Sequence, residues 1–139
     1  MFVLDSNVIS ELMRPAPAAA VVKWIGATPS ASLFTTTVCM AEILYGVALL
    51  PRGKRRRTIE AAAEQMFEED FEGRVLPFDD AAAREFARSA AKRRSTGRPI
   101  AHADAQIAAV TISRGATLAT RNTSDFEGTG VPLVDPWRA

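Results

Sequence analysis

Strand-like and helix-like segments alternate along this chain, and this alternation restricts the possible folds more than any other feature. Short runs rich in β-branched and aromatic residues are typical of buried strands. Five such runs occur: FVL (2–4), SLFTTT (32–37), RVLPF (74–78), ATLAT (116–120) and VPLVD (131–135). Segments with helical periodicity join most of them, which favours a parallel sheet with right-handed crossovers. We therefore expect an α/β fold, a three-layer α/β/α sandwich around a mainly parallel sheet of about five strands.

The composition is that of one folded domain. The 139 residues are 47% hydrophobic and 24% charged, a balance that excludes a disordered or membrane-embedded chain. No repeat, low-complexity tract or long linker divides the sequence, so we expect a single domain over residues 1–139. Lys and Arg number 17 against 16 Asp and Glu, and this near-neutral balance by itself points to no partner.

The cysteine and histidine content limits which metal sites are possible and which cellular compartment is expected. One cysteine, Cys39, and one histidine, His102, exclude an internal disulfide and a Cys/His metal centre. The N-terminus does not resemble a signal peptide. The most apolar stretch, PAAAVVKWIGA, is interrupted by Lys23 and is too short to span a bilayer. We therefore expect a cytoplasmic protein without a membrane partner.

An aspartate directly follows the first apolar run. In MFVLDSNVIS, Asp5, Ser6 and Asn7 lie where the strand FVL gives way to a helix. Asp5 can be an ordinary helix N-cap that accepts a backbone N–H of the first turn. It can equally be one arm of a metal site, because open α/β sheets bind ligands at the carboxyl ends of their strands. The ten residues alone leave both interpretations open.

A second acid falls among apolar residues in TVCMAEILYGVALL. Glu42 shares a helical face with Val38, Tyr45 and Leu49, which we predict to be a buried stripe. A carboxylate on such a stripe is costly unless it is paired, hydrogen-bonded or bound to a cation. The alternative is that Glu42 lies at the edge of the stripe and reaches solvent or a basic side chain.

Two further acids follow in the last third of the chain. Asp104, in IAHADAQIAAV, shares a predicted helix face with apolar residues such as Ile107. It can also be an acid favoured by the dipole of a first helical turn. After the strand ATLAT, Asn122 and Asp125 either begin a short helix, with Asn122 as its cap, or lie at the same sheet edge as Asp5.

These polar residues lie on four well-separated segments, and a parallel sheet would bring them to one edge. Carboxylates that share a small volume raise one another's pKa unless a cation intervenes. Oxygen ligands without His or Cys select Mg²⁺ or Mn²⁺ over zinc or copper. Such an ion activates water and stabilises charge on phosphoryl oxygens, so phosphodiester hydrolysis is the leading reaction class.

Four motifs resemble, in order and spacing, those of the PIN-domain ribonucleases: LDSNVIS, TVCMAEILYGV, IAHADAQIAA and ATRNTSDF. The likeness is closest to the VapC/FitB branch of toxin–antitoxin toxins, and it covers essentially the whole chain, including the terminal VPLVDPW. The resemblance implies a Mg²⁺-dependent endoribonuclease that hydrolyses RNA as the toxin of a VapBC-type pair. It also implies a homodimer and a small cognate VapB-like antitoxin.

The resemblance also suggests roles for individual residues. Asp5 and Asp104 match direct metal ligands, and Glu42 completes the catalytic cluster directly or through water. Asn122 matches a catalytic position that is a fourth acid in many relatives, and its neutral side chain bears on whether a second ion binds. Asp125 either compensates for this change from the next turn or only braces the loop.

Two hydroxyl residues complete this comparison of positions. Ser6 and Thr120 match positions where a hydroxyl orients carboxylates in similar proteins.

Two runs of basic residues also stand out, PRGKRRRT and AKRRSTGR. They either hold RNA phosphates or are solvated helix ends, and we prefer the second interpretation. Trp24 and Trp137 are expected to be core or interface residues.

Two alternative functions remain. Haloacid-dehalogenase-type phosphatases also place a nucleophilic Asp after the first strand, which would be Asp5 here. They require a second acid two residues later, where this chain has Asn7. The other alternative is a non-catalytic binding subunit that keeps the PIN fold, an interpretation supported by the neutral Asn122.

Overall fold

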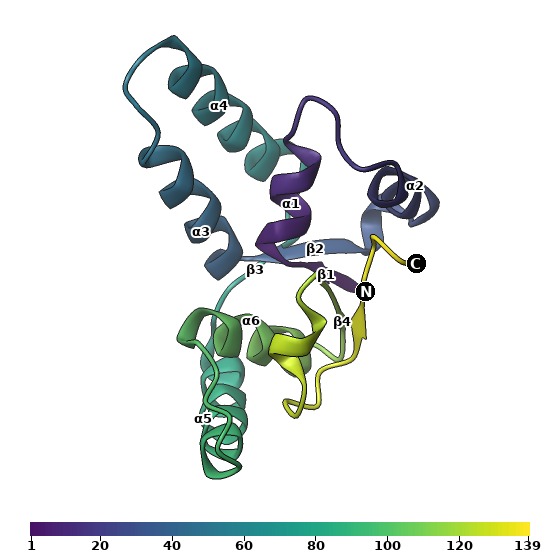
Figure 1. Ribbon diagram of the computed structural model, residues 1–139, viewed down its shortest axis with the longest axis vertical. Coiled ribbons are helices and arrows are strands. Elements are labelled where there is room, and N and C mark those ends of the chain that lie inside the picture. The colour runs from purple at the N-terminus through teal and green to yellow at the C-terminus, as the bar shows by residue number, and fades with distance from the viewer.

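A computed structural model describes residues 1–139 and shows a five-stranded sheet between two layers of helices (Figure 1). The strands are β1 (Phe2–Leu4), β2 (Leu33–Thr36), β3 (Val75–Leu76), β4 (Thr117–Ala119) and β5 (Leu133–Val134). Their order is β3-β2-β1-β4-β5, and every neighbouring pair is parallel. The expected three-layer α/β/α sandwich is confirmed.

Six α-helices cover the two faces of the sheet. They are α1 (Ser6–Leu12), α2 (Ala19–Ala27), α3 (Thr37–Ala48), α4 (Lys54–Gln65), α5 (Asp80–Ser95) and α6 (His102–Ser113). The helices α1 to α4 lie on one side of the sheet, and α5 and α6 lie on the other (Figure 1). Three short elements complete the chain: 3₁₀-helices η1 (Ser30–Ser32) and η3 (Thr123–Phe126), and a π-helical turn, η2 (Met66–Asp70). No helix has the length and apolar character needed to cross a membrane.

Some predicted elements were too long. The runs RVLPF and VPLVD form only two strand residues each, in the edge strands β3 and β5. Pro77 directly follows β3 and Pro132 directly precedes β5, and proline has no N–H to donate to a ladder. The helix α4 begins at Lys54 and ends at Gln65, after which the chain makes the π-helical turn.

The central strand β1 sets the position of the core and of the sheet edge described next. Val3 and Leu4 are fully buried, and α6 contributes Ile107, Ala108 and Val110 from the other layer. Trp24 and Trp137 pack against this core, as expected. The chain moves outward from β1 through β2 and β3 in one direction and through β4 and β5 in the other. Such a reversal creates a crevice at the carboxyl ends of the strands, where α/β proteins bind ligands.

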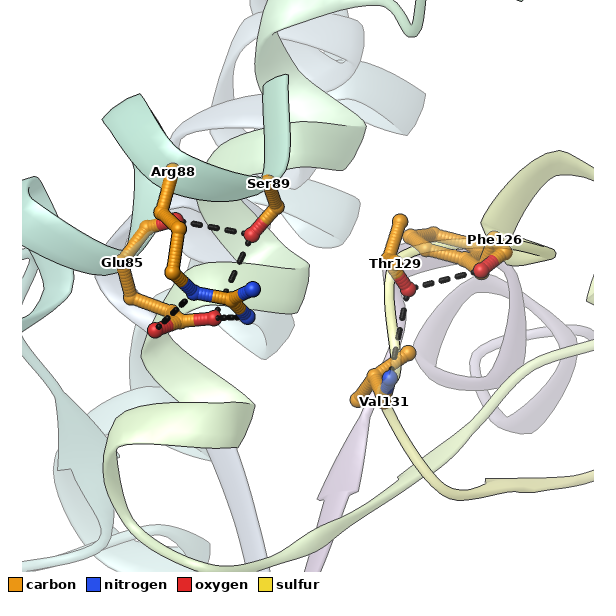
Figure 2. Close-up of polar contacts among 6 residues, drawn as sticks. All are labelled: Glu85, Arg88, Ser89, Phe126, Thr129 and Val131. Atoms are coloured by element: carbon orange, nitrogen blue, oxygen red, sulfur yellow. Dashed lines mark hydrogen bonds and ion pairs between the residues drawn. The ribbon is translucent and has the colours of Figure 1, made fainter. Parts of the chain in front are cut away.

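Local hydrogen bonds form within α5 and within the loop that follows η3 (Figure 2). On α5, Glu85 pairs with Arg88, and the Ser89 hydroxyl donates to the Glu85 carbonyl at 2.7 Å. The buried Thr129 hydroxyl donates to the Phe126 carbonyl at 2.7 Å and accepts the Val131 N–H at 3.3 Å. The Thr129 contacts close the turn that follows η3, and the side chains of Phe126 and Val131 bury this loop against the core.

Candidate functional site

Asp5 lies at the junction of β1 and α1 and is only 4% exposed. Its Oδ1 accepts the Ser6 N–H at 2.8 Å, so Asp5 caps α1 as one interpretation predicted. Its Oδ2 accepts the Thr120 hydroxyl at 2.8 Å and the Asn7 amide at 3.4 Å. Asp5 can therefore cap α1 and also serve as a candidate metal ligand, so the two interpretations do not exclude each other.

Thr120 is the centre of the network that orients Asp5. Its fully buried hydroxyl donates to Asp5 and accepts the Asn7 side-chain amide and the Asn122 backbone N–H, both at 3.1 Å. The Asn7 Oδ1 accepts the Arg121 N–H at 3.3 Å. Asn7 therefore connects the first turn of α1 to the end of β4, a role that the sequence analysis missed because it depends on a contact between distant segments.

Glu42 comes to the same place from α3. One Glu42 carboxylate oxygen, one Asp5 carboxylate oxygen and the Cys39 sulfur all lie within 4.8 Å of one another. The predicted buried stripe was wrong, however, because Tyr45 and Leu49 are 67% and 66% exposed. The buried face of α3 instead carries Cys39, Ile43 and Val47.

Asp104 and Asp125 form the opposite side of the site. Asp104 is in the first turn of α6, and Asp125 is in η3. Together with Arg93 and residues 99–101 they line a hollow of about 290 Å³. Asp104 does not belong to the tight group around Asp5, but its charge is close enough to raise the pKa of Glu42.

The Asn122 side chain makes no hydrogen bond, although the residue is next to this network. Asn122 directly precedes η3 without capping it through its side chain. It takes part through its backbone, because its N–H donates to Thr120 and its carbonyl accepts the Asp125 N–H at 3.1 Å. A helix cap by the Asn122 side chain, one of the two interpretations of this segment, was therefore wrong.

Arg93 is a second residue that the sequence analysis missed. It belongs to the run AKRRSTGR, whose members we expected to be solvated or to contact RNA, yet it is only 6% exposed. Its Nη1 donates to the carbonyls of Asp125 and Glu127, both at 2.9 Å, and its Nε donates to the Arg98 carbonyl at 2.7 Å. Arg93 thus joins α5 to the loop that carries Asp125.

Burial and mutual repulsion raise the pKa of the three central carboxyls. Burial raises the pKa of Asp5 most, and hydrogen bonds from Thr120 and Ser6 only partly oppose it. Burial also raises the pKa of Glu42, followed by the charges of Asp5 and Asp104. The pKa of Asp104 is raised by burial and then by the charges of Asp5 and Asp125, against a smaller opposing effect of Arg93.

The donor set suits a hard divalent cation. The carboxylates of Asp5 and Glu42 offer oxygen ligands, and a cation between them would relieve the repulsion that raises their pKa. Burial raises the pKa of the Cys39 thiol to about 12. The thiol is therefore protonated at neutral pH when no metal ion is bound.

Comparison with known proteins agrees with this geometry. The family model described as PIN domain matches residues 2–130. The chain belongs to the PIN-domain family. VapC ribonuclease Y4jK from Sinorhizobium fredii is 41% identical over 137 residues, which are 99% of this chain and 98% of that protein. Plasmid stability protein StbB from Pseudomonas syringae pv. tomato is 40% identical over 139 residues, the full length of both proteins.

A solved structure supports the same assignment. The crystal structure of FitAcB from Neisseria gonorrhoeae matches this PIN-domain protein with a TM-score of 0.94 at 37% identity, over the whole of both chains. The resemblance to the VapC/FitB branch that the four motifs suggested is therefore confirmed. Nothing in these comparisons supports the haloacid-dehalogenase alternative, and Asn7 is occupied as a hydrogen-bond bridge where that class requires an acid.

Proposed function

We propose that this PIN-domain protein is a Mg²⁺-dependent endoribonuclease that hydrolyses RNA phosphodiester bonds as the toxin of a VapBC-type toxin–antitoxin pair. The observation that carries the proposal is that Asp5 and Glu42, from separate segments, bring carboxylate oxygens within 4.8 Å of each other, with the charges of Asp104 and Asp125 close enough to affect this group. Asp5 is buried, and a buried carboxylate without a counter-ion is costly to a fold. A site for a cation explains why these acids are gathered at one sheet edge.

The residues take distinct roles in this proposal. Asp5 and Asp104 bind the metal, and Glu42, which is accessible to solvent, completes the cluster directly or through a water that it orients. When bound, Mg²⁺ supplies positive charge for the phosphoryl oxygens and lowers the pKa of water, and Mn²⁺ can replace it because it accepts the same oxygen ligands. Asn122 occupies the fourth position of the catalytic cluster without adding charge, which favours one tightly bound ion, with Asp125 close to the outer side of the site.

The proposal includes partners. The relatives of known structure include FitAB bound to a DNA fragment, which has 37% identity to this chain and a TM-score of 0.92. By analogy, we propose that this chain forms a homodimer and is inhibited by a cognate VapB-like antitoxin. An RNA substrate and a reduced Cys39 are consistent with action in the cytoplasm.

Metal-dependent cleavage of a structured RNA tests the proposal directly. We expect the wild-type protein to cleave RNA in Mg²⁺ and not in EDTA. We expect the variants Asp5→Asn and Asp104→Asn to cleave RNA in neither condition. Asp80→Asn is the matched control, because Asp80 lies in the first turn of α5 as Asp104 does in α6, and its side chain is 85% exposed. It should keep full activity.

The same variants discriminate against a non-catalytic binding subunit. Such a subunit would cleave no RNA, or any trace cleavage would be equal in wild type, Asp5→Asn and Asp104→Asn, and either result would refute the nuclease. The toxin role is tested in cells. Expression of wild type without an antitoxin should stop growth, and Asp104→Asn should relieve this toxicity at an equal protein level.

A further inference from the structure

Arg121 and Trp137 form a pair at the edge of the site that the roles above do not use. Arg121 lies two residues beyond β4, and Trp137 lies three residues beyond β5. Parallel pairing sets Ala119 beside Val134, so both residues follow their strands at the edge that carries Asp5. The guanidinium carbon of Arg121 is 5.0 Å from the centre of the Trp137 ring, which is a cation–π contact.

The pair is tied to the rest of the molecule at both ends. Trp137 packs against the core, and its backbone N–H donates to the Asp135 carboxylate at 2.9 Å. The Arg121 backbone N–H donates to the Asn7 Oδ1 at 3.3 Å, and the Asn7 side-chain amide in turn donates to Asp5 at 3.4 Å. The network that orients the proposed metal ligand therefore also fixes the backbone of Arg121.

The charge of Arg121 is not neutralised within the protein. None of the seven ion pairs in the structure includes it, and the acid beside Trp137, Asp135, pairs with Arg138 at 3.8 Å. The charges that shift the pKa of Asp5 and Asp104 come from other residues. The side chain is exposed, so an unpaired guanidinium that contacts the Trp137 ring faces solvent, and its backbone is anchored to Asn7, which contacts Asp5.

We propose that Arg121, seated on Trp137, binds a phosphate of the RNA strand next to the scissile phosphate. This inference rests on the proposed ribonuclease function and adds a substrate-binding residue to it. A guanidinium matches two phosphate oxygens with parallel N–H donors, and stacking on a ring occupies its face while its N–H edges stay free. The seat on Trp137 reduces the conformational entropy that a long side chain loses on binding.

Steady-state cleavage of a fluorescein-labelled RNA hairpin that wild type cleaves, measured at several salt concentrations, tests this role. We expect Arg121→Ala to raise KM about tenfold and to change kcat less than threefold. One lost phosphate contact should also reduce the slope of log KM against log salt by about 0.7 to 0.9. Arg121→Lys keeps the charge, so it should keep the slope with an intermediate KM.

Two further variants separate the seat from the charge and from general surface effects. Trp137→Leu should raise KM while it keeps the salt slope, because the guanidinium loses only its platform. Arg114→Ala is the control, since Arg114 is also a surface arginine but lies just beyond the far end of α6 from Asp104. It should leave KM and the salt slope unchanged.

The possible results are distinguishable from a failure of the proposed function. If wild type cleaves no RNA, both the function and this inference are overturned. If wild type cleaves but Arg121→Ala keeps the KM and salt slope of wild type, or lowers kcat alone, only the inference is overturned. Should Arg121→Ala not fold, Arg121→Gln replaces it, because Gln keeps a polar side chain without the charge, and the same criteria apply.

Discussion

The hydroxyl of Thr120 should be worth more to stability than its size suggests, and Thr120→Val tests this. The hydroxyl is fully buried, donates to Asp5 at 2.8 Å and accepts two N–H groups. A hydrogen bond to a charged group contributes about 1.5 to 3 kcal/mol. Two donors left without an acceptor add to this cost, so we expect Thr120→Val to lose about 3 kcal/mol.

This loss converts into a measurable shift of the melting temperature. For 139 residues the entropy of unfolding is roughly 0.3 kcal/mol/K, so Thr120→Val should lower Tm by about 10 °C. Thermal unfolding followed by circular dichroism in EDTA measures it. The protein concentration must be kept constant, because the Tm of a dimer depends on it.

Thr120→Ser is the matched control for this experiment. It keeps the hydroxyl and removes one buried methyl group, which costs about 1 kcal/mol, so its Tm should lie well above that of Thr120→Val. The hydrogen bond from Thr120 lowers the pKa of Asp5, so the deficit of Thr120→Val should shrink as the pH falls and Asp5 becomes protonated. If Ser and Val are equally unstable, or if their difference does not depend on pH, the hydroxyl does not have this role.

Three other predictions concern charge and burial. Asp104→Asn should raise Tm in EDTA near pH 8 and lose this advantage at acidic pH, whereas Mg²⁺ should stabilise only wild type. The reason is that the pKa of Asp104 in the folded protein is raised above the ordinary value of 3.8, so its contribution to stability is present below pH 3.8 and is lost as the pH rises through the folded-state pKa. Arg93→Met should cost about 3 kcal/mol or more in urea unfolding, because three carbonyls lose their donor, whereas the same change at the exposed Arg94 should cost little. Cys39, with its pKa raised to about 12 by burial, should resist iodoacetamide in the folded protein and react in urea, as mass spectrometry can show.

The layered fold was predictable because the hydrophobic periodicity of each segment reports its own secondary structure. Alternating strand-like and helix-like segments were sufficient to predict a parallel five-stranded sandwich. The ends of the edge strands were not predicted well, since the pattern of apolar residues around Pro77 and Pro132 continues where the hydrogen-bond ladder cannot. The periodicity of apolar residues reports which side chains are buried, whereas the end of a strand depends on which backbone N–H groups can donate to its neighbour.

Glu42 was selected for a reason that the structure does not support. The helix α3 has apolar residues on two faces, and the sequence pattern does not show which face meets the sheet. The structure buries Cys39, Ile43 and Val47 and leaves Tyr45 and Leu49 exposed. Glu42 still reaches Asp5 because it lies one residue from the buried face.

Contacts between distant residues were the least predictable part of the site. The hydrogen bonds of Thr120 to Asn7 and Asp5 join residues 113 and 115 positions apart. Arg93 was hidden in a basic run in which its neighbours are exposed, since position within a helix end does not reveal which arginine turns inward. Candidate ligands follow from residue type and strand position, but the residues that hold them in place depend on tertiary geometry.

The burial of Cys39 bears on which metal the proposed site selects. A thiol 4.0 Å from Asp5 would normally favour zinc, because thiolate binds soft cations strongly. Burial raises the pKa of this thiol to about 12, so the thiol is protonated at neutral pH when no metal ion is bound. A soft metal ion must therefore displace a proton at a high energetic cost, whereas the carboxylates ionise more readily and gain from any cation that reduces their repulsion. We therefore expect the burial of Cys39 to favour oxygen-binding ions over soft ions at the proposed site.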